Sequence, residues 1–284
     1  MVRIEDYGEF ETAWCPGCGN FGILKALKKA LVGLGKEPHE VLLVSGIGQS
    51  GKLPHYLRCN TFNGLHGRTL PPATGAKAAN QELTVLAIAG DGDAYGEGGN
   101  HLVHAIRRNP DITLLVHNNQ IYGLTKGQAS PTSDLGMKTK VQGHGVFETP
   151  LNPLALAISL DCSFVARGFA GDVSHLSNLI AKAIKHKGFS LVDILQPCVT
   201  FNRLNTFQWY RERVYRLEDT GHRPDDRTEA FEKSLEWGDK IPIGVFYERR
   251  GPTFEDNLPA LSRGPLYRQK HDLSLVEKLM EKFM

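Results

Sequence analysis

The sequence predicts an α/β fold with a doubly wound parallel sheet. Apolar runs of strand length alternate with stretches of helical periodicity from residue 20 to residue 197. These runs are almost wholly apolar, as expected for strands that are buried on both faces. Strands that alternate with helices form parallel sheets with helices on both sides. With 284 residues, the chain can bury a full core in one large domain or two small ones.

Composition argues against several classes of protein. The chain has 33 basic and 31 acidic residues, a balance that gives no indication of a nucleic-acid-binding surface. No apolar run approaches the ~18 residues that a membrane-spanning helix needs. The first residues, MVRIEDYGEF, lack the apolar core of a signal peptide. We therefore expect a cytoplasmic protein that binds neither nucleic acid nor a membrane.

The chain begins with an amphipathic helix and a buried strand. Residues 20–34 place their leucines and isoleucine on one face and their lysines on the other, which is typical of a helix packed against a sheet. Residues 41–48, VLLVSGIG, form an apolar run that ends in glycines, as a buried strand does. Residues 49–76 lack periodicity and are rich in glycine and polar groups. We expect a long binding loop there.

The chain is organised around residues 83–128, which predict a strand, a helix and a second strand. The first apolar run ends in Gly90-Asp91-Gly92 and the second in Asn118-Asn119, and twenty-five residues separate Gly92 from Asn118. That length is about what a turn, a crossover helix and a returning strand require. Because open parallel sheets bind ligands at the carboxyl ends of their strands, we expect the two polar groups to face one crevice.

The alternation continues through the next hundred residues. A loop over 122–150 is rich in glycine, serine, threonine and lysine. After it, periodicity predicts a short helix at 152–160, a strand at 163–168, a helix at 173–187 and a strand at 190–197.

The character of the sequence changes beyond Cys198. The residues that follow are charged and aromatic and have no clear strand period, and a helix is expected near 272–283. We therefore divide the chain into a domain of residues 1–198 and an extension of residues 199–284. We expect the extension to wrap the core or to cover a partner.

The two polar groups fit a site for a metal-bound diphosphate. Asp91 follows a strand and is flanked by glycines, while the side chain of Asn119 and the carbonyl of Ile121 could supply two further oxygens. The nearby glycines let the backbone approach phosphates, and the following helix presents its N-terminus to them. The alternative is that Gly-Asp-Gly is only a turn and Asn-Asn only a helix cap. Their spacing and strand context favour the metal site.

The five cysteines lie at positions 15, 18, 59, 162 and 198. Cys15 and Cys18 form a Cys-Pro-Gly-Cys pair, which in a cytosolic protein indicates metal binding or redox chemistry rather than a structural disulfide. Cys162 lies beside a predicted strand, and we expect it to be a small buried residue.

A set of ordered motifs resembles one known family. The motifs are WCPGCGN, SGIG, LHGR, GDGD, GGNH, HAIRRN and NNQIYGLTKGQ, and a weaker likeness continues through NTFQWYRERVY and IPIGVFYERRGPTFED. They resemble the beta subunit of 2-oxoacid:ferredoxin oxidoreductases, which bind thiamine diphosphate and act on acids such as pyruvate or 2-oxoglutarate. The resemblance implies a sheet of the thiamine-diphosphate-binding type. It also implies oxidative decarboxylation of a 2-oxoacid with coenzyme A to acyl-coenzyme A and carbon dioxide, with reduction of ferredoxin.

The resemblance assigns residues to the cofactor. Mg²⁺ would be bound by Asp91, Asn119 and the carbonyl of Ile121. The residues that would line the cofactor are Gly48, Gly90, Gly92 and Asp93.

The resemblance also assigns residues to catalysis. His66 and Arg68 of LHGR would lie near the cofactor, where a charge or donor could meet phosphate or a developing oxyanion. Lys126, and with it Lys52, would receive the carboxylate of the 2-oxoacid. The alternatives are that Lys52 is only solvated and that Arg68 is a buried ion-pair partner.

The family beta subunit usually holds one 4Fe–4S cluster through four cysteines. Cys15, Cys18 and Cys198 match three of these ligands, but this chain has Gln49 where the remaining one is expected, and a neutral amide is a poor replacement for a thiolate. Cys59, ten residues further on, is one candidate for the missing ligand. Otherwise the cluster has a ligand other than cysteine, is labile or is absent, or zinc binds the cysteine pair instead.

The resemblance implies an obligate partner. Thiamine enzymes need a glutamate beside the aminopyrimidine ring, which in this family belongs to another subunit, so we expect a complex with an alpha subunit. Two alternative functions stay open at this point. One is a thiamine-dependent, non-oxidative decarboxylase or synthase subunit without a cluster, and the other is a non-catalytic zinc-binding scaffold. The motifs leave open which 2-oxoacid is used.

Overall fold

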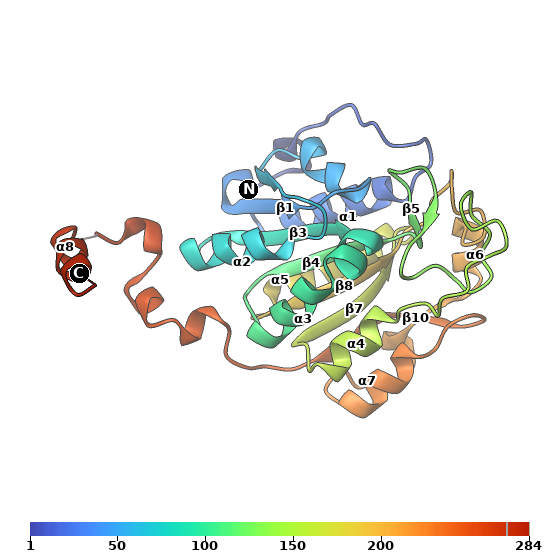
Figure 1. Ribbon diagram of the computed structural model, residues 1–284. Helices are drawn as coiled ribbons and strands as arrows, with labels where there is room; N and C mark the ends of the chain where they lie inside the picture. The colour runs from blue at the N-terminus through green and yellow to red at the C-terminus, as the bar shows by residue number, and fades with distance from the viewer. Residues whose placement is uncertain (271, 284) are drawn as a thin grey trace.

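A computed structural model describes residues 1–270 and 272–283, and its centre is an eight-stranded sheet (Figure 1). The strand order is β2-β1-β3-β4-β8-β7-β10-β9, and a small hairpin of β5 and β6 lies outside the sheet. The strands are β1 (Val41–Ser45), β2 (Asn60–Asn63), β3 (Thr84–Gly90), β4 (Thr113–Asn118), β5 (Ile121–Tyr122), β6 (Gln128–Ala129), β7 (Phe164–Phe169), β8 (Ser190–Leu195), β9 (Val214–Arg216) and β10 (Ile241–Glu248).

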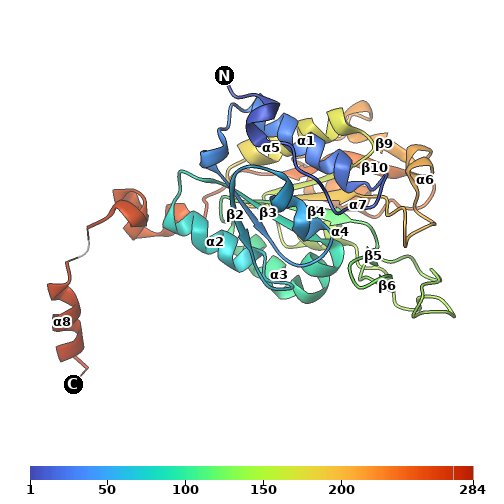
Figure 2. The same cartoon turned by 90° about the horizontal axis from the view of Figure 1, so that it is seen from above.

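Helices cover both faces of the sheet, as Figures 1 and 2 show. Helices α1 (Asn20–Gly33) and α5 (Val173–Lys185) pack on one face. Four helices pack on the other: α2 (Leu70–Ala79), α3 (Gly99–Arg108), α4 (Pro153–Ser159) and α7 (Arg227–Ser234). Because side chains alternate along a strand, Leu86 and Ile88 of β3 enter the first layer while Val85 and Ala87 enter the second. The predicted doubly wound α/β fold is confirmed.

The central unit has the predicted register. Strands β1, β3, β4, β8 and β7 are parallel, and Gly90 at the end of β3 pairs with His117 near the end of β4. The Gly-Asp-Gly and Asn-Asn groups therefore follow neighbouring strands at the same edge of the sheet. Between them lie a π-helical turn over Gly92–Glu97 and then α3.

The prediction of one long loop over residues 49–76 is partly wrong. It contains a 3₁₀ turn over Ser50–Tyr56, the edge strand β2, and the first part of α2. All four residues of β2 are exposed, so this strand has no apolar pattern to reveal it. Helix α2 begins with prolines in its first turn, where the missing N–H groups cost no hydrogen bond.

The extension expected at residues 199–284 joins the sheet. Strand β10 is antiparallel to β7, and β9 is parallel to β10, so the sheet is not parallel throughout. All residues of β10 except the last are buried, and its apolar side chains enter three different hydrophobic clusters. The division of the chain at residue 198 stays a prediction.

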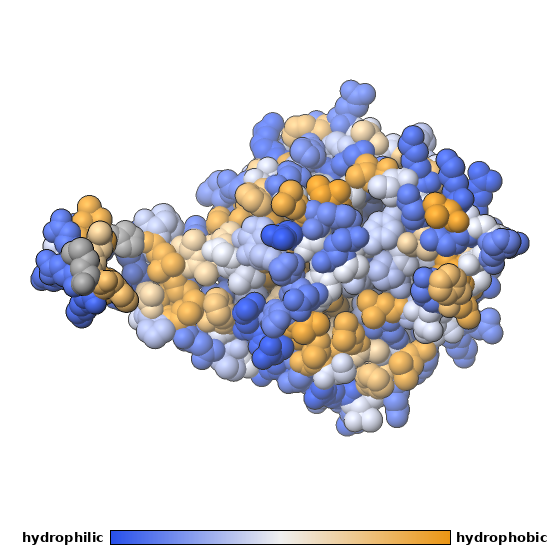
Figure 3. Space-filling model, in the orientation of Figure 1, coloured by the Kyte–Doolittle hydropathy of each residue, from blue (hydrophilic) through white to orange (hydrophobic). Residues whose placement is uncertain are grey.

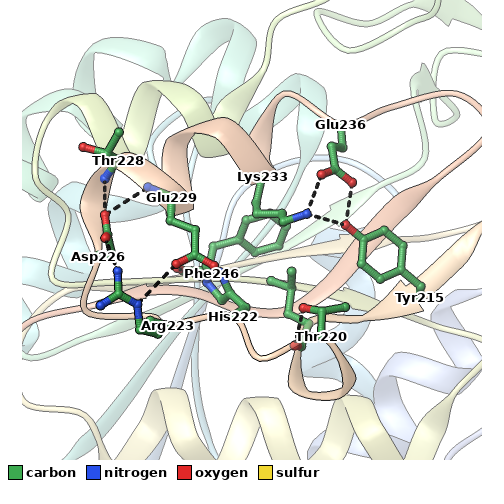
Figure 4. Close-up of polar contacts among 11 residues, drawn as sticks. Tyr215, Thr220, His222, Arg223, Asp226, Thr228, Glu229, Lys233, Glu236 and Phe246 are labelled. Carbon is green, nitrogen blue, oxygen red and sulfur yellow. Dashed lines mark hydrogen bonds and ion pairs between the residues drawn. The ribbon is translucent and has the colours of Figure 1, made fainter.

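A polar network supports this edge of the sheet (Figure 4). Asp226 caps α7 by accepting hydrogen bonds from the backbone N–H groups of Thr228 and Glu229. The ring of His222 is bonded through one nitrogen to the Glu229 carboxylate and through the other to the carbonyl of Phe246 in β10. The network therefore holds α7 against the sheet.

The chain ends in an arm that leaves the body of the molecule. The arm passes α2, where Arg268 forms an ion pair with Glu82, and it finishes in α8 (Ser274–Glu281), which stands apart from the sheet in Figures 1 and 2. The apolar side chains of α8 are exposed, as the arm in Figure 3 shows. The helix predicted near 272–283 is confirmed. Within the described residues, no helix has the length and apolar character needed to cross a membrane.

Candidate active site

The carboxyl ends of β3 and β4 bring two predicted groups together. Asp91 follows β3 and is 2% exposed, and Asn118 ends β4 and is 4% exposed. The hydroxyl of Thr132 lies 2.7 Å from the Asp91 carboxylate and 2.9 Å from the side-chain oxygen of Asn118. The two groups that were expected to face each other therefore lie side by side, and the long loop after β6 bridges them.

Asp91 is a buried carboxylate surrounded by oxygen atoms. It accepts hydrogen bonds from the hydroxyls of Ser130, at 2.6 Å, and Thr132. Burial raises the pKa of Asp91 to about 6, with a further contribution from the nearby Asp193 carboxylate, while the two hydroxyls act in the opposite direction. Carboxylate, amide and hydroxyl oxygens are the donors that Mg²⁺ prefers. The residues around Asp91 therefore suit a hard divalent cation.

Asn119 and Ile121, the other predicted metal ligands, begin the β5–β6 hairpin. The side-chain oxygen of Asn119 accepts a 3.0 Å hydrogen bond from the N–H of Ile121. The backbone carbonyl of Asn119 accepts another, also at 3.0 Å, from the side chain of Asn202. These bonds hold the segment in place directly after Asn118. Metal binding by Asn119 and Ile121 stays a prediction.

Asp93 connects three segments of the chain. Its buried carboxylate accepts hydrogen bonds from the N–H groups of Ile47 (3.0 Å) and Gly67 (2.8 Å) and from the hydroxyl of Thr69 (2.9 Å), and it lies 2.6 Å from Nδ1 of His66. The role expected for Asp93 in lining a diphosphate is not supported, because its oxygens are already engaged. Asp93 instead holds the loop after β1 and the LHGR segment against the turn after β3.

His66 lies at the rim of this turn with two residues that the sequence patterns did not single out. Nε2 of His66 is 3.3 Å from the Glu97 carboxylate, and Glu97 also accepts a 3.1 Å hydrogen bond from the hydroxyl of Tyr122. Burial, and then the Glu97 carboxylate, raise the pKa of Tyr122 above its usual range. The ring of Tyr122 packs so closely on Gly92 that a Cβ atom there would overlap it. Both residues lie next to predicted motifs, in GDGDAYGEGG and NNQIYG.

The predicted cations are accessible. Arg68 and Lys126 are exposed, Lys52 is half-buried, and none of the three forms an ion pair within the described residues. The alternative that Arg68 is a buried ion-pair partner is therefore wrong. Lys126 lies in the turn of the β5–β6 hairpin with a φ of 75°. The roles of these three cations stay predictions.

A buried network that the sequence patterns did not reveal lies beneath the crevice. Asp193 in β8 accepts hydrogen bonds from Tyr95 (2.8 Å), the side chain of Asn118 (3.0 Å) and Arg167 in β7 (3.4 Å). Burial raises the pKa of Asp193, although the Arg167 guanidinium opposes this. In the sequence, only the charged residues Arg167 and Asp193, each within an otherwise apolar strand, point to this network. The network positions Asn118 beside Asp91.

Three of the predicted cluster cysteines line one pocket. Cys15, Cys18 and Cys198 surround it together with Gln49 and Asn119. The pocket is held together by two contacts. The side-chain amide of Gln196 donates a 3.4 Å hydrogen bond to the Cys18 sulfur, and the indole of Trp14 donates one of 2.8 Å to the backbone carbonyl of Gln49. Asn119 lines this pocket and is also a predicted ligand of the metal, so the cysteine pocket adjoins the candidate metal site.

The other two cysteines lie elsewhere. The Cys59 thiol contacts the carbonyl of Asn60 at the start of β2 and packs against the α1 layer, and burial raises its pKa to about 12. The prediction that Cys59 completes the cluster is therefore not supported. Cys162 is fully buried in the opposite layer, as expected. Within the described residues, no three His, Cys, Asp or Glu side chains form a group that could hold a single metal ion.

Comparison with known proteins identifies the class first. Residues 46–194 match the family described as thiamine pyrophosphate enzyme, C-terminal TPP binding domain. This range begins directly after β1 and contains β2 to β7, most of β8 and Asp91, so the chain carries a thiamine-diphosphate-binding domain. Residues 198–263 match the C-terminal part of the pyruvate ferredoxin oxidoreductase beta subunit.

The relatives identify the family. A 2-oxoacid:ferredoxin oxidoreductase beta subunit from Saccharolobus solfataricus is 50% identical over 87% of this chain and 89% of its own length. The KorB subunit of a 2-oxoglutarate synthase from Archaeoglobus fulgidus is 44% identical over 86% of this chain and 94% of its own. The chain belongs to the family of 2-oxoacid:ferredoxin oxidoreductase beta subunits, which act with an alpha subunit.

A solved structure has the same fold over nearly the whole chain. It is the 2-oxoglutarate:ferredoxin oxidoreductase from Magnetococcus marinus with 2-oxoglutarate, coenzyme A and succinyl-CoA bound. It is 37% identical, has a TM-score of 0.90, and covers 98% of this chain and 96% of its own. The resemblance inferred from the motifs is confirmed. The alternative functions, a non-oxidative subunit and a zinc-binding scaffold, are not favoured.

Proposed function

We propose that this beta subunit binds Mg²⁺ and the diphosphate of thiamine diphosphate at the crevice between β3 and β4. With its alpha subunit it would convert a 2-oxoacid and coenzyme A to acyl-coenzyme A and carbon dioxide. The electrons would leave through an iron–sulfur cluster in the cysteine pocket and reach ferredoxin. The observation that carries the proposal is the buried Asp91 carboxylate, surrounded by oxygen donors at the edge where the strand ends meet.

The metal would be held by the side chains of Asp91 and Asn119 and by the carbonyl of Ile121. These three groups follow the ends of two adjacent parallel strands. The cation would favour the ionised form of Asp91, whose charge is otherwise opposed by burial. Gly90 and Gly92 would allow the diphosphate to approach the backbone, and Gly48 would lie at the neighbouring turn after β1.

When bound, thiamine diphosphate supplies the carbon nucleophile that attacks the ketone of the substrate and then accepts electron density during decarboxylation. The residues of this chain orient and stabilise charge around that reaction. His66 is held through Nδ1 by Asp93, and its Nε2 faces the Glu97 carboxylate at the rim, where the ring would lie near the cofactor. Arg68 would act as an unpaired cation near the phosphates or a developing oxyanion.

The substrate proposed is 2-oxoglutarate or a related 2-oxoacid. A relative and the structural match are both named for 2-oxoglutarate, which supports testing this dicarboxylate first. Because 2-oxoglutarate has two carboxylates, its binding calls for two cations. Lys52 and Lys126 are candidates, since neither has an ion-pair partner within the described residues that would compete with a substrate carboxylate. We assign Lys126 to the substrate carboxylate and Lys52 to a supporting position.

The cluster proposed for the cysteine pocket would be bound by Cys15, Cys18 and Cys198. Burial raises the pKa of the Cys18 thiol to about 11, and the hydrogen bond from Gln196 opposes this rise. A bound metal would favour the thiolate further. The pocket adjoins Asn119 and so lies beside the proposed cofactor site. Ferredoxin as the external acceptor and the cytoplasm as the location stay predictions.

The proposal is tested with the anaerobically purified complex of this chain and its alpha subunit. Release of carbon dioxide is measured for 2-oxoglutarate, pyruvate and a branched-chain 2-oxoacid, each with coenzyme A and with oxidised ferredoxin as acceptor. We expect turnover of at least one acid that depends on thiamine diphosphate, coenzyme A and both subunits. A Lys126→Met variant should raise KM for the preferred acid more than it lowers kcat.

The isolated chain is the matched control. It should bind little thiamine diphosphate and release no carbon dioxide, because the alpha subunit supplies the rest of the site. Full activity of the isolated chain would contradict the proposal. Decarboxylation by the complex without ferredoxin reduction would instead favour a non-oxidative reaction.

A further inference from the structure

The cysteine pocket contains fewer thiols than a four-cysteine cluster site requires. All five cysteines of the chain are in the described residues. Three line the pocket, whereas Cys59 packs in the α1 layer and Cys162 is fully buried in the opposite layer. Neither of these two cysteines lines the pocket. This chain therefore offers three thiolates, one fewer than the four that 4Fe–4S clusters use.

Gln49 occupies the remaining wall of the pocket. Its backbone is held by the hydrogen bond from Trp14, and its side chain packs beside Gly123 at the hairpin. The side-chain oxygen of Gln49 is buried and has no hydrogen-bond partner. Buried polar atoms without a partner are uncommon in proteins. Gln49 lines the same pocket as the three cysteines.

An amide oxygen cannot replace a thiolate at iron. It is a neutral, hard donor, whereas iron–sulfur clusters are bound by soft, negatively charged thiolates. Three thiolates suffice for three irons of a cluster, and the fourth iron is then left with a weak or exchangeable ligand. The pocket therefore offers a thiolate to three irons of a cluster and none to the fourth, unlike a four-cysteine site.

We propose that this pocket holds a cluster with one iron that has no cysteine ligand, so that this iron is lost on oxidation and can be rebound. The inference rests on the proposed function, since it assumes a cluster at these cysteines. Removal of one electron by ferricyanide would convert [4Fe–4S]²⁺ to [3Fe–4S]⁺ and Fe²⁺, while Cys15, Cys18 and Cys198 would hold the remaining three irons. Supplying Fe²⁺ with one electron from dithionite reverses the step.

The test uses the complex with the alpha subunit, purified without oxygen. Iron and acid-labile sulfide are measured before and after treatment with ferricyanide, and electron paramagnetic resonance spectra are recorded at each stage. We expect the wild-type complex to lose one iron in four while it keeps its sulfide. A signal from a paramagnetic three-iron cluster should appear, and it should disappear when Fe²⁺ and dithionite are added.

Three variants make the test specific to Gln49. Gln49→Cys should supply the fourth thiolate, so that iron is retained after ferricyanide and the three-iron signal stays small. Gln49→Ala should behave like the wild type, because the amide is not a strong ligand. Cys59→Ser, the matched thiol control, should also behave like the wild type.

The outcomes distinguish this inference from the proposed function. A wild-type cluster that keeps all its iron under ferricyanide would show a strong fourth ligand, for example from the partner, and would overturn the inference alone. Loss of the cluster in Cys59→Ser would also overturn the inference alone, because it would show that Cys59 is a cluster ligand. A complex without iron or sulfide in both the wild type and Gln49→Cys would overturn the inference together with the proposed cluster. If Gln49→Cys fails to fold, oxidation and rebinding in the wild type and Gln49→Ala still decide the question.

Discussion

The hydroxyl of Ser130 donates a 2.6 Å hydrogen bond to the carboxylate of Asp91, which lies thirty-nine residues earlier in the chain. Thr132 makes a second such contact at 2.7 Å. The long loop after β6 is therefore attached to the residue that we assign to the metal. Binding of a metal at Asp91 and the position of this loop are linked through the same two hydroxyls.

Replacement of Asp91 tests the metal site directly. We expect Asp91→Asn to reduce binding of thiamine diphosphate in the presence of Mg²⁺ by at least about 100-fold, because even the outer partners of metal ligands contribute ~10–100-fold. Isothermal titration calorimetry of the complex measures this affinity. The control is Asp172→Asn, which keeps a side chain that can cap α5 but removes the ion pair with Arg216, and it should leave cofactor affinity unchanged. Unaltered affinity in Asp91→Asn would contradict the assignment.

Replacement of Asp93 should affect the fold rather than the cofactor alone. Asp93→Ala leaves the N–H groups of Ile47 and Gly67 and the hydroxyl of Thr69 without their acceptor. We expect the free energy of unfolding to fall by about 3–5 kcal/mol, since several buried donors lose a charged partner. Urea denaturation followed by circular dichroism measures the change. Normal stability combined with lost cofactor binding would restore the diphosphate role first predicted for Asp93.

The pair of Lys77 and Asp111 makes stability depend on pH. Burial alone would raise the pKa of Asp111, but the ammonium groups of Lys77, at 3.1 Å, and Lys187, at 3.0 Å, outweigh it and hold that pKa below the usual 3.8. Because the folded-state pKa is lowered, the pair stabilises the fold above pH 3.8, and this contribution is lost as pH falls through the folded-state value.

Lys77→Met should therefore destabilise the fold at neutral pH. We expect a loss of about 2–3 kcal/mol at pH 7, less than the ~3–5 kcal/mol of a fully broken buried pair because Lys187 remains. The difference from the wild type should shrink as pH falls below 3.8 and through the lower folded-state pKa of Asp111. Denaturation curves over this range measure it. The exposed Lys187, replaced by Met, should change stability by less than about 1 kcal/mol.

The cysteines should differ in their rates of alkylation. Cys15 is exposed and should react first with iodoacetamide in the native chain without a cluster. Cys162 should react last, because it is fully buried and burial raises its pKa to about 12. Only the thiolate is a good nucleophile. Mass spectrometry after timed labelling measures the order, and all five should react in denaturant. Rapid labelling of Cys162 in the native chain would contradict its burial.

Much of the fold could be predicted because it is encoded locally. The apolar runs of β1, β3, β4, β7 and β8 and the face of α1 each show their period within a few residues. The segments that escaped prediction lack such a local signal. Strand β2 is exposed along its length, whereas the apolar run of β10 is interrupted by Pro242 and Gly244 and pairs with a strand about eighty residues earlier in the chain.

The candidate site, like the fold, could be predicted from the sequence only in part. The sequence by itself determined that Asp91 and Asn119 follow adjacent strands, because each follows its own apolar run, and that Cys15 and Cys18 form a pair. Only the tertiary structure decided that Asp93 is a structural acceptor and that Gln49, rather than Cys59, completes the cysteine pocket. The reason is physical: a hydrogen bond or a pocket wall depends on which distant segments meet, and no local pattern records that.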